Sequence, residues 1–221
     1  MKFSDDGALL AIQRLRMIES QLRQRGIKDE RVLAAMARVP RHEFTPEQFR
    51  SQAYADHPLP IGKGQTISQP YIVALMLEAL ALKPADKVLE VGTGSGYVTA
   101  LLAELADQVV SLERFPALAD MARSQLSQLG YTNVQVNAGD GTQGFPQSAP
   151  YDAILVSAAT AGVPAALLSQ LTERGRMIIP VGPPDAQQLQ LIRMQDRQPQ
   201  TTWRETCRFV PLLPGMGESG H

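Results

Sequence analysis

KVLEVGTGSGYVTALLAEL, residues 87–105, is the stretch that decides the fold. A short apolar strand over 87–91 runs into Gly92, Gly94 and Gly96, and a helical pattern of apolar residues follows. Glycines at a strand-to-helix turn accept positive φ and let backbone N–H groups approach a ligand with no Cβ in the way. The pattern predicts an α/β protein with a ligand site at this turn.

Two acidic residues indicate what the ligand contains. Glu90 stands just before the turn, and Glu113 ends the next apolar strand, over 109–113, where a nucleotide ribose is usually held. An adenosine-containing cofactor is therefore expected. Counted from Gly92, the third glycine of a dinucleotide fingerprint is replaced by Tyr97, whose ring disfavours a pyrophosphate. The form E-x-G-x-G-x-G is instead the one that S-adenosylmethionine-dependent methyltransferases use, while an ordinary tight turn between strand and helix remains the alternative.

Composition narrows the class of protein. The chain has 221 residues, a formal net charge of −1 and 44% hydrophobic residues, which favours one α/β domain and gives no basic excess for nucleic acid or membrane surfaces. The apolar stretch near 72–82 contains Glu78 and is too short to span a bilayer. Cys207 is the single cysteine, so no internal disulfide or cysteine metal site is expected, and a reducing cytoplasm fits. The first ten residues lack the order of a signal peptide.

The first third of the chain reads as helices around one long loop. Helices are predicted over 9–25, from Asp29 to Arg38, from Thr45, and from Ser68 to about Leu82. Residues 54–69 have no usable period, and such long loops are often functional.

The rest alternates between strand and helix, which predicts a mostly parallel central sheet with helices on both faces, a Rossmann-like fold. Strands are expected over 87–91, 109–113, 134–137, 152–157 and 177–181, with helices over 97–105, 116–129 and 164–171, the last ended by Gly175. Strands over 188–193 and 205–212 should pair antiparallel at one edge. We predict a single domain, 1–221, made of N-terminal helices and substrate loop (1–82), a Rossmann-like core (83–214) and a flexible tail (215–221).

Ligands in such sheets bind beyond the carboxyl ends of the strands. Residues 90–96, Glu113 and 138–141 follow the first three strands and should outline one pocket. The glycines would pass the methionine part, Glu113 would accept the ribose hydroxyls, and Asp140 would face the adenine amino group. As alternatives, Glu113 could cap or pair on the surface, and Asp140-Gly141 could be a plain turn.

Several longer motifs point to one family. They are RVPRHEF (38–44), PLPIGKGQTISQPYIVALMLEAL (58–80), VLEVGTGSGY (88–97), GDG (139–141), APYDAILVSAA (149–159), GRMIIPVG (175–182) and RFVPL (208–212). With these motifs the chain resembles the protein-L-isoaspartate O-methyltransferases over nearly its whole length. The GQTISQP block is specific to that family, whereas the glycine motif is general to methyltransferases.

The resemblance implies methyl transfer from S-adenosyl-L-methionine to the free α-carboxylate of L-isoaspartyl residues, after which the ester closes to a succinimide that hydrolyses partly to aspartyl. It implies Ser68 as the catalytic residue and no metal. The implied cofactor-binding residues are Thr66, Ile67, Ser68, Glu90, Gly92, Thr93, Gly94, Ser95, Gly96, Glu113, Asp140 and Gly141. The implied substrate-binding residues are Leu59, Pro60, Ile61, Ser68, Val210, Pro211 and Leu212. Isoaspartyl peptides and damaged proteins are the expected partners of a cytoplasmic monomer.

The chemistry agrees with this set. A carboxylate with a pKa of about 3.5–4 is already the nucleophile at neutral pH, so the site needs desolvation and alignment rather than a general base. The chain has only three histidines. The Ser68 hydroxyl would orient the substrate carboxylate, but Ser68 directly before Gln-Pro is also a good helix N-cap. The two roles are compatible, since a helix N-terminus favours an anion.

Some positions depart from the family pattern, and other functions stay open. The departures are Thr142, Ser157, the loop 160–162 and the segment 173–175. A methyltransferase acting on a small molecule or RNA, a non-catalytic S-adenosylmethionine-binding protein and, more distantly, a nicotinamide dehydrogenase are the alternatives.

Overall fold

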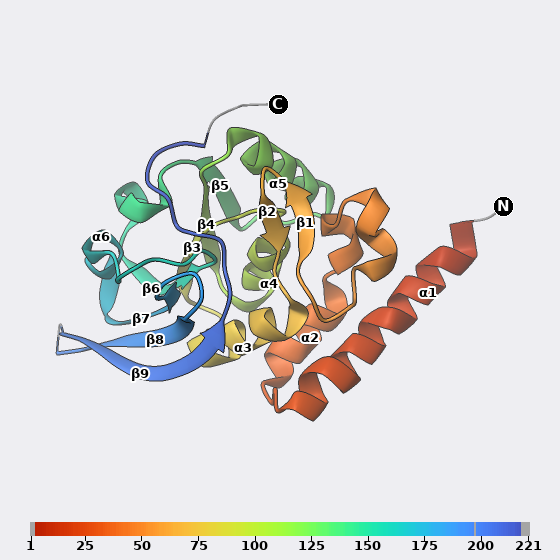
Figure 1. Ribbon diagram of the computed structural model, residues 1–221, viewed down its shortest axis with the longest axis horizontal. Coiled ribbons are helices and arrows are strands. Elements are labelled where there is room, and N and C mark those ends of the chain that lie inside the picture. The colour runs from red at the N-terminus through yellow and green to blue at the C-terminus, as the bar shows by residue number, and fades with distance from the viewer. Residues whose placement is uncertain (1–2, 197, 218–221) are drawn as a thin grey trace.

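The protein is built around a twisted central sheet (Figure 1). The computed structural model describes residues 3–196 and 198–217. Within those residues, seven strands lie in the order β5-β4-β3-β6-β7-β8-β9. Their bounds are Lys87–Val91 (β3), Gln108–Glu113 (β4), Val134–Ala138 (β5), Tyr151–Val156 (β6), Leu171–Val181 (β7), Gln187–Gln195 (β8) and Gln198–Cys207 (β9). The first five of these run parallel, and β8 and β9 pair antiparallel at the edge. The chain moves outward from β3 to β5 and then returns to β6, so the strand order reverses beside β3.

Helices cover both faces of the sheet, but unequally. The helices α3 (Pro70–Leu80), α4 (Tyr97–Leu105) and α5 (Pro116–Gln128) share one apolar core with the N-terminal helices and with one set of strand residues, Val88 and Leu155 among them. Alternate strand residues such as Leu89 and Ile154 pack on the other face with Leu167 of the short helix α6 (Ala165–Leu168). Because side chains alternate along a strand, burial of both faces requires the near-continuous apolar runs seen in the sequence. The predicted fold class is confirmed.

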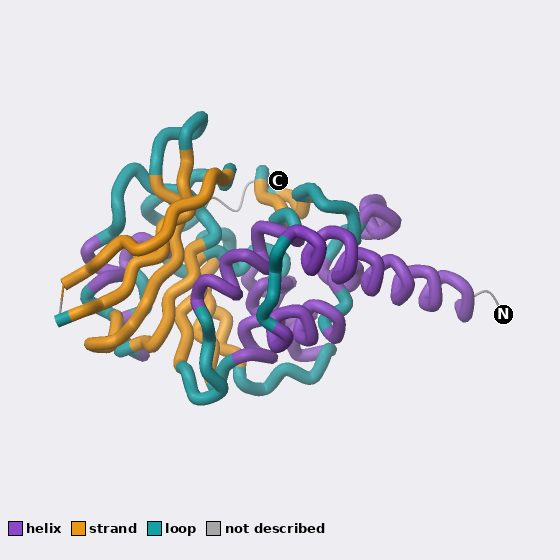
Figure 2. Tube along the Cα trace, turned by 90° about the horizontal axis from the view of Figure 1, so that it is seen from below, coloured by secondary structure: helices purple, strands orange, loops and turns teal. Residues whose placement is uncertain are grey.

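The N-terminal helices form as their sequence signals indicate. Helix α1 (Phe3–Arg16) continues through a π-helical turn (Met17–Leu22) and a 3₁₀ turn (Arg23–Arg25) and stops at Gly26, whose φ is +97°. Asp29 caps α2 (Glu30–Arg38) by accepting hydrogen bonds from two backbone N–H groups. Figure 2 shows the beginning of α1 extending beyond the rest of the molecule.

The predicted loop over 54–69 is wrong in part, because it contains a small antiparallel hairpin. Strand β1 (Leu59–Gly62) pairs with β2 (Gln65–Ile67) through the turn Gly62-Lys63-Gly64, whose three residues all have positive φ. The hairpin is stabilised by burial of Leu59 and Ile61. Its strands are too short to show a clear alternation of apolar and polar residues, which explains why the sequence did not predict it.

The predicted helix over 164–171 is too long. The helix α6 has only four residues, and β7 already begins at Leu171. Gly175 therefore lies inside a strand instead of ending a helix. A Cβ at Gly175 would come within 2.9 Å of Leu171 Cβ, so the backbone folds closely upon itself here and requires glycine.

The last predicted strand, over 205–212, is shifted. Strand β9 ends at Cys207, and residues 208–217 leave the sheet edge to cross the carboxyl ends of the parallel strands; we call them the crossing segment (Figure 1). Leu212 N–H donates to Ala159 O at 2.6 Å, and Gly217 N–H donates to Arg114 O at 2.7 Å. Of the predicted tail, residues 218–221 lie outside the described residues.

Candidate active site

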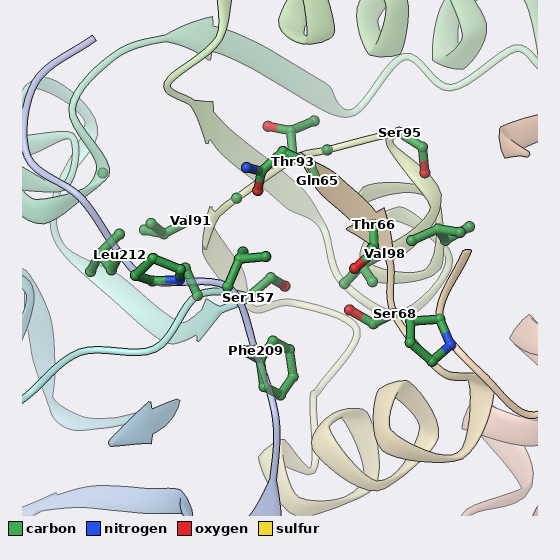
Figure 3. A pocket seen from close by; sticks show the side chains of 18 of the residues that line it. Gln65, Thr66, Ser68, Val91, Thr93, Ser95, Val98, Ser157, Phe209 and Leu212 are labelled. Atoms are coloured by element: carbon green, nitrogen blue, oxygen red, sulfur yellow. The ribbon is translucent and has the colours of Figure 1, made fainter. Parts of the chain in front are cut away.

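A pocket of about 580 Å³ opens at the carboxyl ends of β3, β4 and β6, where the strand order reverses. Its lining comes from the hairpin and the start of α3, from the glycine turn after β3, from the end of β9 with the crossing segment, and from the residues that follow β4, β5 and β6 (Figure 3). Open α/β sheets bind ligands at such a reversal. Of the residues expected at the site, those that line the pocket are Thr66, Ile67, Ser68, Gly92, Thr93, Gly94, Ser95, Glu113, Gly141, Val210, Pro211 and Leu212.

The glycine turn fits a closely held ligand. Gly92, Gly94 and Gly96 have φ of +95°, +54° and +90°, values that other residues rarely adopt. A Cβ at Gly92 would lie 3.3 Å from Ser157 Cβ, and one at Gly141 would overlap the Val91 side chain. Added side chains would therefore press on the walls around the turn. Gly96 does not line the pocket; it caps α4 and packs against α5.

Glu113 is fixed by the backbone of that turn. Its carboxylate accepts hydrogen bonds from Gly94 N–H at 2.8 Å and Phe115 N–H at 3.0 Å. Only 4% of Glu113 is exposed, yet it lines the pocket. The preceding N–H groups, of Gly92 and Thr93, donate to Leu112 O. The turn therefore aims one carboxylate into the pocket, the group that ribose hydroxyls would require.

Glu90 lies beneath the turn and does not line the pocket. Its side chain is completely buried, and one carboxyl oxygen accepts hydrogen bonds from the Ser111 and Thr99 hydroxyls, each at 2.5 Å. Ser111 in turn contacts the Thr93 hydroxyl. Burial raises the pKa of the Glu90 carboxyl to about 8, so it is mostly neutral at pH 7. This geometry braces the glycine turn through Ser111 and Thr93.

Asp140 also lies just outside the pocket. Its carboxylate accepts hydrogen bonds from the N–H and hydroxyl of Thr142, and from Gly215 N–H at 2.7 Å. Burial opposes ionisation, but these hydrogen bonds leave the pKa of the Asp140 carboxyl below its ordinary value. The side chain thereby ties the crossing segment to the end of β5. Its neighbour Gly141 does line the pocket.

Ser68 presents a free hydroxyl to the pocket, and its predicted role as a helix cap is wrong. The N-cap of α3 is Gln69, with no side-chain cap, and Pro70 begins the helix. The Ser68 hydroxyl has no hydrogen-bond partner among the described residues, while the backbone carbonyl of Ser68 accepts from Arg41. Figure 3 shows the hydroxyl directed into the space that Ser157 and Phe209 border from the opposite side.

The residues expected to bind the substrate are only partly in the pocket. Leu59 and Ile61 are buried and do not line the pocket, and Pro60 is exposed. Ile61 instead packs against the glycine turn, since a Cβ at Gly94 would be 3.2 Å from its Cδ1. Sequence reasoning did not assign several lining residues, among them Pro58, Gln65, Tyr97, Arg114, Ser157, Ala158, Cys207, Arg208 and Phe209. Positions just beyond strand ends were the signal that could have found Arg114 and Ser157.

The lining has little acid–base chemistry. Among the described residues that line the pocket, the charged side chains are those of Glu113, Arg114 and Arg208, and neither histidine nor lysine is present. The described residues also contain no cluster of His, Cys, Asp or Glu side chains suited to a metal ion. None of the helices within residues 3–196 and 198–217 combines the length and apolar character needed to cross a membrane. Such a pocket suits a substrate that brings its own nucleophile.

Comparisons with known proteins agree on one family. The family model of protein-L-isoaspartate(D-aspartate) O-methyltransferase matches residues 13–217. A protein-L-isoaspartate O-methyltransferase of Koribacter versatilis is 57% identical over 219 residues, covering 99% of both chains. One from Methanoculleus marisnigri is 53% identical and covers 94% of both.

Solved structures show the same likeness. A protein-L-isoaspartate O-methyltransferase superposes with a TM-score of 0.83 at 30% identity, covering 92% of this chain and 67% of the other. A Plasmodium falciparum protein of the same family, in complex with S-adenosyl-L-homocysteine, gives 0.78 at 28% identity and covers 90% and 98%. The family model matches most of the chain, the relatives are more than half identical over nearly its full length, and the pocket lies where the strand order reverses. This chain therefore belongs to the protein-L-isoaspartate(D-aspartate) O-methyltransferase family.

Proposed function

We propose that this protein transfers a methyl group from S-adenosyl-L-methionine to the free α-carboxylate of L-isoaspartyl residues in peptides and damaged proteins. The observation that carries the proposal is the meeting of the glycine turn and Glu113 with Ser68 in one pocket. Family membership and a relative solved with S-adenosyl-L-homocysteine support it.

On the cofactor side, Glu113 would accept the ribose hydroxyls, and the turn from Gly92 to Ser95 would lie along the methionine part. S-adenosyl-L-methionine supplies an electrophilic methyl group on a cationic sulfur. Gly141 would leave room at the adenine side, with Asp140 behind it. No metal is required for this chemistry.

On the substrate side, the protein's work is positioning. The carboxylate is ionised at neutral pH and needs no proton removed, which agrees with the absence of histidine and lysine among the described lining residues. The Ser68 hydroxyl would donate a hydrogen bond to one carboxylate oxygen and leave the other directed at the methyl group. The crossing segment from Val210 to Leu212 would hold the peptide and exclude water, while Thr66 and Ile67 would border the cofactor.

A pair of synthetic peptides tests the function directly. The peptides are identical except for one L-isoaspartyl or L-aspartyl linkage, and each is incubated with methyl-labelled S-adenosyl-L-methionine. Base-labile label on the isoaspartyl peptide alone is expected. No label on either peptide, with cofactor binding intact by calorimetry, would contradict the proposal and favour a changed substrate or a binding role. In that event the loop 160–162, which departs from the family pattern and does not line the pocket, is the first segment to exchange.

We also propose that the protein acts as a cytoplasmic monomer, without nucleic acid or membrane. The nearly balanced charge, −1, supports the absence of nucleic-acid and membrane binding, and the single cysteine, Cys207, fits a reducing compartment. Sedimentation at several concentrations, with and without added RNA, checks it; a concentration-dependent dimer or a comigrating RNA contradicts it.

A further inference from the structure

Arg41 stands behind the pocket and contacts two residues that line it, Ser68 and Tyr97. It opens a 3₁₀ turn (Arg41–Phe44), and its side chain is completely buried. Nε donates to Ala53 O at 2.7 Å, and Nη2 donates to Ser68 O at 2.8 Å. The guanidinium carbon lies 4.9 Å from the centre of the Tyr97 ring. Tyr97 directly follows the glycine turn, so one side chain spans the substrate loop and the cofactor side.

The placement of this charge is costly. No carboxylate lies within ion-pair distance of Arg41 among the described residues, and its Nη1 atom has no hydrogen-bond partner. In the same part of the chain, the buried Tyr97 hydroxyl also has no hydrogen-bond partner. Burial lowers the pKa of the Arg41 guanidinium only to about 10, so the group remains a cation at neutral pH. Burying a cation that contacts only two carbonyls and a ring costs free energy, so a contribution to stability alone does not explain this arginine.

Through its hydrogen bond to the Ser68 carbonyl, the Arg41 guanidinium holds the backbone at Ser68. That residue lies between β2 and α3, and within residues 3–196 and 198–217 its hydroxyl has no hydrogen-bond partner to orient it. With the Ser68 carbonyl held by Nη2, the peptide plane after Ser68 is fixed, and the direction of its Cα–Cβ bond is restricted. We propose that Arg41 is a positioning residue, which sets the Ser68 hydroxyl relative to the glycine turn through the Ser68 carbonyl and the Tyr97 ring. The inference rests on the proposed function.

The chain offers a matched control in Arg176. This arginine is also buried, 7% exposed, and donates to Leu80 O, Ala81 O and Asp152 O, with Asp86 as its ion partner. It does not line the pocket and contacts no lining residue through these bonds. Replacing either arginine by lysine removes the planar fork that bridges several acceptors while the charge is kept. The two variants therefore share the structural damage and differ in what the arginine touches.

The first measurement compares Arg41→Lys with Arg176→Lys. For Arg41→Lys we expect kcat on the isoaspartyl peptide to fall about 10- to 100-fold, with the Kd of S-adenosyl-L-homocysteine changed less than about threefold. For Arg176→Lys we expect a lower Tm and an unchanged kcat. Combining Arg41→Lys with Ser68→Ala should cost little more than either change alone. Full kcat in folded Arg41→Lys, or losses that multiply in the double variant, would overturn the proposal.

A second measurement does not depend on activity. Hydrogen exchange of the peptide covering 65–69 should accelerate in Arg41→Lys and stay unchanged in Arg176→Lys. If the wild-type protein methylates neither peptide, the proposed function fails while this readout still decides the role of Arg41. Arg41→Gln serves where Arg41→Lys does not fold, because a neutral amide is cheaper to bury than an ammonium. Unchanged exchange at 65–69 in the folded variant contradicts the inference.

Discussion

The Glu113 carboxylate lies 2.8 Å from the N–H of Gly94, so the acid at the end of β4 is oriented by the turn that ends β3. The two residues belong to neighbouring parallel strands, and the strand register brings them to the same edge. This contact makes the turn and the acid one unit, and changes to either should alter cofactor binding.

Glu113→Gln should weaken S-adenosyl-L-homocysteine binding about 10- to 100-fold, because hydrogen bonds to a charged acceptor contribute about 1.5–3 kcal/mol each. Calorimetry measures the Kd. Glu104→Gln is the control, since Glu104 of α4 pairs with Arg38 of α2 at 2.8 Å and does not line the pocket. An unchanged Kd in Glu113→Gln would remove Glu113 from the cofactor site.

Ser68→Ala should lower kcat on the order of 10- to 100-fold, since it removes a hydrogen-bond donor positioned for the reacting carboxylate. The Kd of S-adenosyl-L-homocysteine and the Tm should hardly change, because Ser68 caps no helix. Steady-state kinetics and a melting curve make the comparison, and Ser68→Thr should restore part of kcat. A normal kcat in the alanine variant contradicts the catalytic role.

Glu90→Gln should change how stability depends on pH. The folded-state pKa of Glu90, about 8, lies above its ordinary value of 4.5, so the native state holds the proton more tightly than the unfolded state. The associated stability is fully present below pH 4.5 and is lost as pH rises towards about 8, with a slope of up to about 1.4 kcal/mol per pH unit.

Urea denaturation at about pH 5, 6.5 and 8 measures the free energy of unfolding of both proteins and checks this pH dependence. The wild-type protein should lose stability relative to Glu90→Gln across the series, while the Kd of S-adenosyl-L-homocysteine remains similar in the two proteins. Parallel stability curves would show that Glu90 is ionised when buried. A large loss of cofactor affinity would assign Glu90 to the cofactor instead of to the brace beneath the turn.

Gly217→Ala should release the far end of the crossing segment. A Cβ at Gly217 would overlap the Phe115 ring, where the segment is held by the hydrogen bond to Arg114 O. We expect dissociation of S-adenosyl-L-homocysteine to become several-fold faster, as measured by stopped-flow displacement. Gly162→Ala is the control, since nothing lies within 4 Å of its added Cβ. Equal dissociation rates in both variants would separate the segment from cofactor retention.

The sequence predicts those parts of the fold that depend on local pattern. The apolar run into Gly92, Gly94 and Gly96 specifies strand, turn and helix within twenty residues, and β3 and α4 have the predicted bounds. Ligands of open α/β sheets bind beyond the carboxyl ends of the strands, and on this basis the sequence predicts Glu113 and Gly141 in one pocket, which both of them line.

What the sequence cannot show depends on contacts between distant segments. The hairpin over 59–67 is held by burial of Leu59 and Ile61, which no period announces. The apolar run within residues 208–212 predicts the end of a strand, but the Gln187 side chain accepts from Phe209 N–H and donates to the Phe209 carbonyl, which draws the chain away from the sheet edge. Likewise Arg41 reads locally as a surface arginine beside a proline, and only the fold places it behind Ser68.

The crossing segment also gives the protein an order of assembly. Chains are made from the N-terminus, and domains generally fold as units. Strands β3 to β7 and the glycine turn are complete before residues 206–213 exist, yet these later residues form one wall of the pocket. A chain that has not yet reached residues 206–213 therefore lacks this wall, and the pocket is complete only when these residues have docked across the sheet.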